Sequence, residues 1–487
     1  MRRSLLALGV LGLTACGSGS GGAATSSSAT AAASGTPSAA LSATGTSSTA
    51  TSSSAAATGD DHSAAARAFV ELLARGAWDE ALLRVTAQAR AALDAGKLAE
   101  GWKAAVGAHG PFVAVRGSDR EVRGDREVVT VHVALAKGTM DVRVGFAGSA
   151  EVAMLRASPA EGSWEAPAYV DAKKLEAREV AVGAPDRALP GTLTLPKGEG
   201  PSAIVLLVHG SGPGDRDDSV GPSRPFRDLA EGLASRGIAV LRWEKRTRDQ
   251  AYLAAIHVSP ADLTVKEEYL DDFAAAVAFA KETAGVDRKR IFVAGHSEGG
   301  WLVPWLLRDH PELSGGIALA GHARPFASIL PKQIEYLGKL ATGGPDDPRL
   351  GAHLELVKKQ CALALDPKLA PDTPASDLPL GVPAKYWLSL QGYDAVATAK
   401  ALRHPLLILQ GGRDYQVTEA DDLELWKKGL AGRPDVVQKV YPKLNHAFFA
   451  GEGMATPTEY ETVAGHVDAA VVEDIAAFVG KYGGENR

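Results

Sequence analysis

Cysteine is almost absent from this chain. Only Cys16 and Cys361 occur among its 487 residues, which excludes a disulfide framework and a cysteine-ligated zinc site. Long apolar runs are missing too: no stretch reaches 18 apolar residues, so no helix is expected to span a membrane. There is no excess of positive charge either, since the net charge is −6 and acidic and basic residues are interspersed. A nucleic-acid-binding chain normally carries a basic stripe, so that class is excluded as well.

What is present has the composition of a globular protein. Hydrophobic residues make up 45% of the chain and charged residues 23%, which are ordinary values for a folded protein. At roughly 100–200 residues per domain, the length predicts two or three folded units.

The first residues have the pattern of an export signal. Residues 1–3 carry positive charge, and residues 5–13 are apolar but too short to cross a bilayer. Residues 13–16 read Leu-Thr-Ala-Cys and resemble a bacterial lipobox, which implies cleavage before Cys16 and attachment of lipid to that cysteine. An ordinary secretory signal with a chance cysteine is the alternative. The expected location is the bacterial cell envelope, with the protein exported and facing the periplasm or the exterior.

A polar stretch follows the proposed lipid site. Residues 17–60 are almost wholly Ser, Ala, Thr and Gly, with no charge before Asp60. Such a composition cannot bury enough apolar surface to offset the entropy of ordering, so it predicts a disordered tether. Membrane contact is then expected through the lipid alone, and Cys361 is expected to be a buried, inert thiol.

Residues 61–175 change pattern twice. Residues 62–108 have helical spacing of apolar residues, whereas residues 112–157 alternate as strands do. Helices followed by an antiparallel sheet predict a small α+β domain. It resembles the cone-shaped domains of the nuclear-transport-factor type and a domain found before hydrolases in bacterial lipoproteins. His109 and His132 are candidates for lining a pocket, although a structural role is the favoured interpretation.

From about residue 176 to 487 the order of apolar and helical segments is typical of an α/β protein. A hairpin is expected near 179–195, and continuous apolar runs then alternate with helical stretches. The runs are residues 203–208, 238–241, 291–294, 317–320 and 406–409, with a weaker strand at 437–441. This alternation predicts a mostly parallel sheet flanked by helices. Residues 322–400 interrupt it and are expected to form a helical cap, broken into short helices by prolines.

A nucleophile motif lies between one of these strands and a helix. Gly295-His296-Ser297-Glu298-Gly299 fits G-x-S-x-G, directly after the apolar run 291–294 and before a helical stretch. That setting is the strand–turn–helix of a nucleophile elbow, with Ser297 as the nucleophile. A glycine-rich turn with a buried serine is the alternative reading.

A serine nucleophile needs a base and an orienting acid, in the chain order Ser, acid, His. Asp414 follows the run 406–409 in a glycine turn, and His446 follows the strand 437–441. These two residues are therefore the predicted acid and base. Rival residues lie on the neighbouring helical stretches, where their side chains are expected to point elsewhere: Glu419, Asp421, Asp422 and His466.

The oxyanion of the reaction needs backbone donors. One is expected to be the N–H of Glu298, next to the nucleophile. The other is expected to be the N–H of Ser211, in the glycine-rich loop 209–217 after the run 203–208. The charged residues of that loop are expected to brace it through salt bridges: Asp215, Arg216 and Asp217.

Together, residues 176–487 resemble the α/β-hydrolase superfamily. The loop 207–212 and the elbow are most similar to dienelactone-hydrolase-like and serine-aminopeptidase-like bacterial esterases. The nucleophile departs from that of the dienelactone hydrolases, because Ser297 stands in place of a cysteine. The resemblance implies a Ser–His–Asp mechanism through an acyl-enzyme, with no metal and no organic cofactor.

The favoured function is therefore a carboxylesterase acting on a small-molecule acyl ester. A peptidase or amidase with the same triad is one alternative, and the triad does not discriminate between them. The aromatic residues of the cap are the candidates for doing so: Tyr336, Tyr386, Trp387 and Tyr393. A non-catalytic surface-binding lipoprotein is the second alternative. No nucleic acid is expected as a partner, and no protein partner is identifiable.

Overall fold

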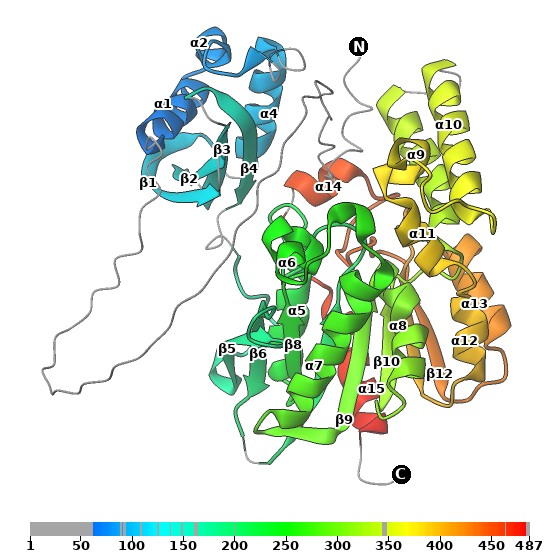
Figure 1. Ribbon diagram of the computed structural model, residues 1–487. Helices are drawn as coiled ribbons and strands as arrows, with labels where there is room; N and C mark the ends of the chain where they lie inside the picture. The colour runs from blue at the N-terminus through cyan, green and yellow to red at the C-terminus, as the bar shows by residue number, and fades with distance from the viewer. Residues whose placement is uncertain are drawn as a thin grey trace, which may run out of the picture.

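The computed structural model describes residues 62–483 apart from short gaps. The gaps are residues 88–89, 91–93, 108–109, 124–125, 137, 148–149, 160–163, 199, 343–347 and 463. The predicted signal, the lipobox Cys16, the tether and His109 all lie outside the described residues. Two sheets, one of four strands and one of eight, organise the described part of the chain (Figure 1).

The four-stranded sheet belongs to the first folded unit and confirms the predicted order of helices before strands. The strands run β1-β2-β3-β4 with antiparallel neighbours, and the inward-facing Val129, Val131 and Val133 have no exposed surface. Its elements are α1 (Ser63–Ala74), α2 (Trp78–Leu82), α4 (Ala95–Gly107), β1 (Phe112–Arg123), β2 (Arg126–Leu135), β3 (Gly138–Ala147) and β4 (Val152–Pro159). Its likeness to the cone-shaped transport-factor domains stays a prediction.

The eight-stranded sheet has the order β12-β11-β10-β9-β7-β8-β6-β5. The β5–β6 and β6–β8 pairs are antiparallel and the other pairs are parallel, as the opening hairpin and the later apolar runs predicted. The strands are β5 (Leu175–Val182), β6 (Leu189–Pro196), β7 (Ser202–Val208), β8 (Ala239–Trp243), β9 (Val286–His296), β10 (Gly315–Leu319), β11 (Leu406–Gly411) and β12 (Val436–Tyr441).

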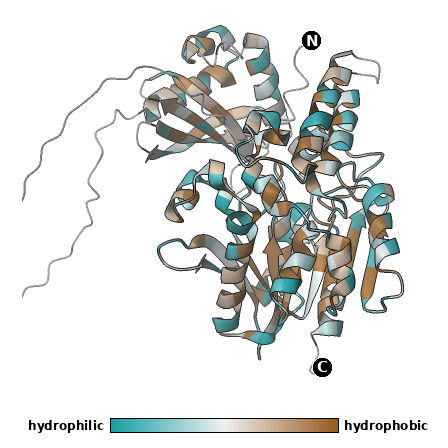
Figure 2. Ribbon diagram, turned by 45° about the vertical axis from the view of Figure 1, so that its right-hand side comes forward, coloured by the Kyte–Doolittle hydropathy of each residue, from teal (hydrophilic) through white to brown (hydrophobic). Residues whose placement is uncertain are grey.

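Helices cover both faces of this sheet, and Figure 2 shows its apolar strands enclosed by helices with more polar outer faces. Side chains of one face of the sheet pack against α7 (Asp271–Glu282), α8 (Glu298–Asp309) and α13 (Glu424–Gly429). Those of the other face pack against α5 (Pro225–Ala234) and α15 (Ala469–Tyr482). Burial on both sides explains why these strands read as continuous apolar runs and not as alternating ones.

The cap consists mainly of helices, and one detail of its prediction was wrong. Prolines were expected to break it into short helices, and residues 375–401 do form only short helices. The prediction fails before them, because α9 (Phe326–Thr342) contains Pro331 and α10 (Pro348–Leu365) begins with a proline, and both are long. Pro348 costs little at the first position of α10, because the N–H that it lacks has no partner inside the helix, whereas Pro331 lies inside α9, which continues through it. Figure 1 shows α9 and α10 side by side; α11 (Ala384–Leu390) and α12 (Ala395–Ala401) return the chain to β11.

Two further short α-helices are α6 (Gln250–Ala255) and α14 (Pro457–Thr462), and single turns of 3-10 or π helix lie between the longer elements. The segment that joins the two units is tied to α5 and to the loop before α15. Trp164 donates from Nε1 to Asp228 at 2.8 Å, and the Tyr169 hydroxyl donates to the Val467 carbonyl at 2.7 Å. Cys361 is a buried free thiol, as predicted, and burial raises its pKa to about 11.

Candidate active site

Ser297 occupies the turn between β9 and α8. Its backbone angles are φ 54° and ψ −115°, a conformation that costs an L-residue about 1–3 kcal/mol. The turn is held by the Ser297 N–H, which donates to the Leu319 carbonyl at 2.8 Å, and by the Trp301 N–H, which donates to the Ser297 carbonyl at 3.0 Å. A strained serine at the carboxyl end of a central strand is the geometry that a nucleophile elbow requires.

The two glycines of the motif are required by close backbone contacts. A Cβ atom on Gly295 would collide with the backbone of Gly299. A Cβ atom on Gly299 would collide with the backbone of Val208 and His209, at the end of β7. The elbow therefore fits against the loop after β7 only because both positions lack a side chain.

His446 and Asp414 meet as the sequence predicted. His446 Nδ1 lies 2.7 Å from Asp414 Oδ2, and the two side chains are 6% and 0% exposed. The two residues follow β12 and β11, which are adjacent parallel strands, so their loops emerge at the same edge of the sheet. Because a carboxylate only accepts hydrogen bonds, Nδ1 carries the proton of the neutral ring and Nε2 keeps its lone pair.

Asp414 is fixed by three further donors. Its Oδ1 accepts from the N–H groups of Gln416, at 2.8 Å, and Val417, at 3.0 Å. Its Oδ2 accepts from Nε2 of Gln410 at 3.0 Å, in addition to the contact with His446. The orientation of the carboxylate is therefore set before any substrate binds.

The Ser297 hydroxyl makes no hydrogen bond to any residue that the structure describes. A hydrogen bond between Ser297 and His446, the predicted base, is therefore absent from the described part of the chain. Such contacts are often long in a substrate-free site and tighten in the substrate complex.

His296 links the elbow to the loop of His446, a contact that sequence reasoning missed. Its Nε2 donates to the His446 carbonyl at 3.1 Å, and its Nδ1 lies 2.8 Å from Asp218 Oδ2. Burial alone would lower the pKa of His296, but the hydrogen bond and the charge of Asp218 outweigh burial and raise it. No spacing in the sequence could have signalled this pair, because Asp218 lies in a loop 78 residues earlier.

The predicted oxyanion loop lies against Ser297. A Cβ atom on Gly210 would stand 3.2 Å from the Cβ of Ser297, so the backbone that leads to Ser211 passes directly beside the serine. His209, which precedes it, is buried and uses Nε2 to bind the Asp215 carbonyl at 2.9 Å. The N–H groups of Ser211 and Glu298 therefore belong to the two segments that flank Ser297.

Charged residues brace this loop: Arg216 and Asp217 do so through the predicted salt bridges, and Asp215 does so through hydrogen bonds from backbone N–H groups instead. Arg216 binds Glu244 at 2.9 Å, and Asp217 forms an ion pair with Arg242. Asp215 accepts from the Asp217 N–H at 3.1 Å, which closes the turn. These contacts hold the loop and leave its charged side chains paired within the protein.

The Glu298 side chain turns away from solvent into a group of polar residues. The hydroxyls of Tyr269 and Tyr386 lie 3.1 Å and 2.9 Å from its two carboxyl oxygens. Burial raises the pKa of Glu298 to about 7, the charge of Glu268 adds to the increase, and Lys245 opposes it. The sequence left open whether this side chain faces packing or a pocket; it lies between the core and the cap.

The residues considered as alternatives to Asp414 and His446 bind other partners. Asp422 binds Arg324 of the cap at 2.8 Å, and Asp421 pairs with Lys332. His466 was wrongly placed inside the last helix, because α15 begins at Ala469. Its Nδ1 lies 3.1 Å from Asp228, which also accepts the N–H of residue 467 and so fixes this loop ahead of the helix.

The aromatic residues near the end of the cap pack it onto the core. The Tyr393 hydroxyl donates to the Trp301 carbonyl at 2.7 Å, and Trp387 Nε1 donates to the Val382 carbonyl at 3.2 Å. Tyr386, Trp387 and Tyr393 are at most 8% exposed. Tyr336, the fourth candidate, is half-buried and donates from its hydroxyl to the Ala455 carbonyl at 2.9 Å. Their polar atoms therefore serve contacts between the cap and the core, or within the cap.

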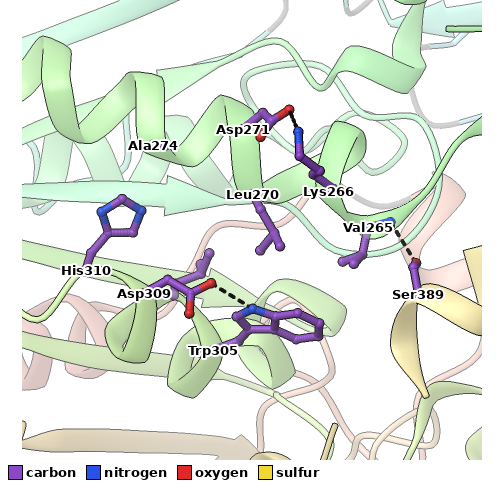
Figure 3. A pocket seen from close by; sticks show the side chains of 10 residues that line it. Val265, Lys266, Leu270, Asp271, Ala274, Trp305, Asp309, His310 and Ser389 are labelled. Carbon is purple, nitrogen blue, oxygen red and sulfur yellow. Dashed lines mark hydrogen bonds and ion pairs between the residues drawn. The ribbon is translucent and has the colours of Figure 1, made fainter. Parts of the chain in front are cut away.

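A surface cavity of about 400 Å³ (Figure 3) is lined in part by Trp305, whose ring lies 4.7 Å from that of Tyr393. It is bounded by Leu270, Trp305 and His310, and Ser389 of the cap lies at its rim. None of the residues that line it belongs to the elbow, to the loop 209–217 or to the Asp414–His446 pair.

His132 of the first unit has a structural environment. Its ring nitrogens lie 2.8 Å from Asp141 and 3.0 Å from Asp119, on the two neighbouring strands. The hydrogen bond to Asp141 raises its pKa, and the bond to Asp119 adds to that effect against burial. The three side chains form a cross-strand ion-pair cluster, which accords with the favoured structural interpretation.

Within the described residues, no group of three or more potential ligands could hold a metal ion. The helices that the structure describes include none with the length and apolarity needed to cross a membrane.

Comparison with known proteins places this site in context. The chain is 35% identical to Esterase EstD of Thermotoga maritima over 414 residues, which cover 85% of this chain and 94% of that esterase. It is 27% identical to a putative carboxymethylenebutenolidase of Methylorubrum extorquens over 208 residues, 40% of this chain and 68% of that protein. Residues 250–329 match the prolyl oligopeptidase family.

Among solved structures, a putative dienelactone hydrolase from Klebsiella pneumoniae is similar with a TM-score of 0.37 and 17% identity. The match covers 63% of this chain and 99% of that one.

Proposed function

Because this chain belongs to the family of α/β-hydrolase esterases that includes Esterase EstD, we propose that it cleaves acyl esters through Ser297, His446 and Asp414. The observation that carries the proposal is the buried His446–Asp414 hydrogen bond of 2.7 Å, on loops that emerge beside a strained serine. A packing role alone would not require a serine in that backbone conformation.

The proposed reaction is an acyl transfer in two halves. His446 Nε2 accepts the proton of Ser297 as its oxygen attacks the ester carbonyl, and the N–H groups of Ser211 and Glu298 bind the oxyanion. The tetrahedral intermediate collapses, and His446 returns the proton to the departing alcohol. Water then attacks the acyl-enzyme with His446 as the base again, which releases the acid and restores Ser297. Asp414 keeps the ring in the required tautomer.

Turnover of p-nitrophenyl acetate, compared with aminoacyl p-nitroanilides, tests this function. We expect hydrolysis of the ester and little or no hydrolysis of the anilides. The match of residues 250–329 to the prolyl oligopeptidase family favours a peptidase as the second candidate. Faster turnover of the anilides would make the peptidase the better assignment.

The cap is proposed to select the substrate, and replacing its aromatic residues tests this. Trp387→Ala and Tyr393→Ala should change the order of kcat/KM among p-nitrophenyl acetate, butyrate and octanoate. The Tyr393 ring joins the cap to Trp301, just after the elbow, and the Trp387 ring packs inside the cap against Phe326. Tyr393→Phe keeps the ring and loses only the bond to Trp301, so it should keep the preference of the wild type. An equal fall in kcat/KM for all three esters would indicate that these rings only hold the cap in place and do not select the substrate.

We also propose that the protein is exported and held at the bacterial cell envelope by a lipid on Cys16. Cys16→Ser should move the protein from the detergent phase to the aqueous phase in a phase-partition assay, because the lipobox cysteine is the only expected attachment point. Cys361→Ala is the matched control, since that thiol is buried in the folded protein, and it should partition like the wild type. Retention of the Cys16→Ser protein in the detergent phase would refute the anchor.

A further inference from the structure

Lys245 is buried directly behind the predicted oxyanion loop. It follows β8 and is 2% exposed, and its ammonium donates to the carbonyls of Gly210 and Gly212, each at 2.8 Å. It also donates to the Tyr269 hydroxyl at 2.7 Å and forms an ion pair with Glu268 at 2.8 Å. A buried charge is costly unless it is fully paired, and this one has four partners.

The contact with Gly210 bears on the peptide group that contains the Ser211 N–H. In a trans peptide the carbonyl and the following N–H point in opposite directions. Fixing the Gly210 carbonyl on Lys245 therefore also fixes the direction of the Ser211 N–H, away from the ammonium. This peptide group lies beside the serine, because a Cβ atom on Gly210 would stand 3.2 Å from the Cβ of Ser297. That N–H has no acceptor among the residues that the structure describes, so it is available to an oxyanion.

The ammonium also changes the strength of that donor. A carbonyl that accepts from a cation is polarised, and polarisation along a chain of hydrogen bonds strengthens the next donor. The Tyr269 hydroxyl lies 2.8 Å from the same Gly210 carbonyl and 3.1 Å from Glu298. Lys245 and Tyr269 thus contact both segments that are expected to donate to the oxyanion: the Gly210 carbonyl of one and the Glu298 side chain of the other.

We propose that Lys245 is a positioning residue of the oxyanion hole, which holds the Gly210–Ser211 peptide with its N–H toward the nucleophile and polarises it. Tyr269 supports the same carbonyl. This inference rests on the proposed function of Ser297. If Lys245 served only to neutralise Glu268, its loss would lower stability without any dependence on the atom that becomes the oxyanion.

A thiono ester separates these two roles. Replacing the carbonyl oxygen of p-nitrophenyl acetate by sulfur gives a weaker hydrogen-bond acceptor, so catalysis of its hydrolysis depends less on the oxyanion donors. Lys245→Met keeps the length of the side chain without its charge. We expect it to lower kcat for the oxygen ester about 10²–10³-fold with KM within a few-fold, and to lower kcat for the thiono ester less than about 10-fold.

Two further variants keep the test decisive. Tyr269→Phe removes only a hydroxyl and should lower the ratio of oxygen-ester to thiono-ester kcat in the same direction, by about 3–10-fold. Lys439→Met removes a half-exposed lysine that pairs with Asp474, and it should leave both rates unchanged. If Lys245→Met does not fold, as judged by circular dichroism, Tyr269→Phe decides the question alone.

An equal loss on the two esters in folded variants, or no loss, would overturn the inference. Failure of the proposed function would look different, because Ser297→Ala would then retain activity and labelling by a fluorophosphonate.

Discussion

Replacement of Ser297 by alanine is expected to lower kcat by roughly 10³–10⁶-fold while the protein stays folded. The loss is large because no acyl-enzyme can form without the hydroxyl. The fold should tolerate the change, since the hydroxyl makes no hydrogen bond within the described chain. The backbone bonds of the turn, to Leu319 and from Trp301, do not involve the side chain.

Hydrolysis of p-nitrophenyl acetate and labelling by a fluorophosphonate measure this effect together. The wild type should be labelled and the variant should not, with melting temperatures within a few degrees of each other. Ser314→Ala is a matched control: this serine precedes β10 at the opposite end of the sheet, and its hydroxyl donates only to the Lys289 carbonyl. Labelling that persists in Ser297→Ala would show that another residue is the nucleophile.

The strands that carry the site could be predicted because burial on both faces leaves a local signal. The apolar runs at 203–208, 291–294 and 406–409 lie within β7, β9 and β11. The elbow could be found for a similar reason, since close backbone contacts at Gly295 and Gly299 forbid side chains there. A local steric demand leaves a local pattern in the sequence.

The polar groups around the elbow could not be predicted, because they join segments far apart in the chain. Glu298 meets Tyr386 of the cap across 88 residues, and Lys245 meets Gly210 across 35. Neither contact leaves a periodic pattern or a motif in the sequence, because each depends on which strands are neighbours in the sheet. In the cap, proline was read as a breaker at every position. Pro348 instead begins α10, where the missing N–H has no partner to lose, and α9 continues through Pro331.

Asp414→Asn is expected to lower kcat by about 10⁴-fold, and the contacts of Asp414 explain why. The amide has one acceptor oxygen in place of two, and two backbone N–H groups already converge on Oδ1 from Gln416 and Val417. If the amide oxygen stays with those donors, its NH₂ group faces His446 Nδ1 and must donate to it.

That reversal forces the ring proton of His446 onto Nε2, the atom that should accept the proton of Ser297. The base is then present but in the wrong tautomer, so kcat should fall while KM changes little. The NH₂ group would also face the donor Nε2 of Gln410, so a modest fall in melting temperature is expected. Asp421→Asn is the control, because that rival acid pairs with Lys332 on the surface and should retain nearly full activity. A loss of less than about 10-fold in a folded Asp414→Asn protein would mean that His446 is not oriented by Asp414 during catalysis.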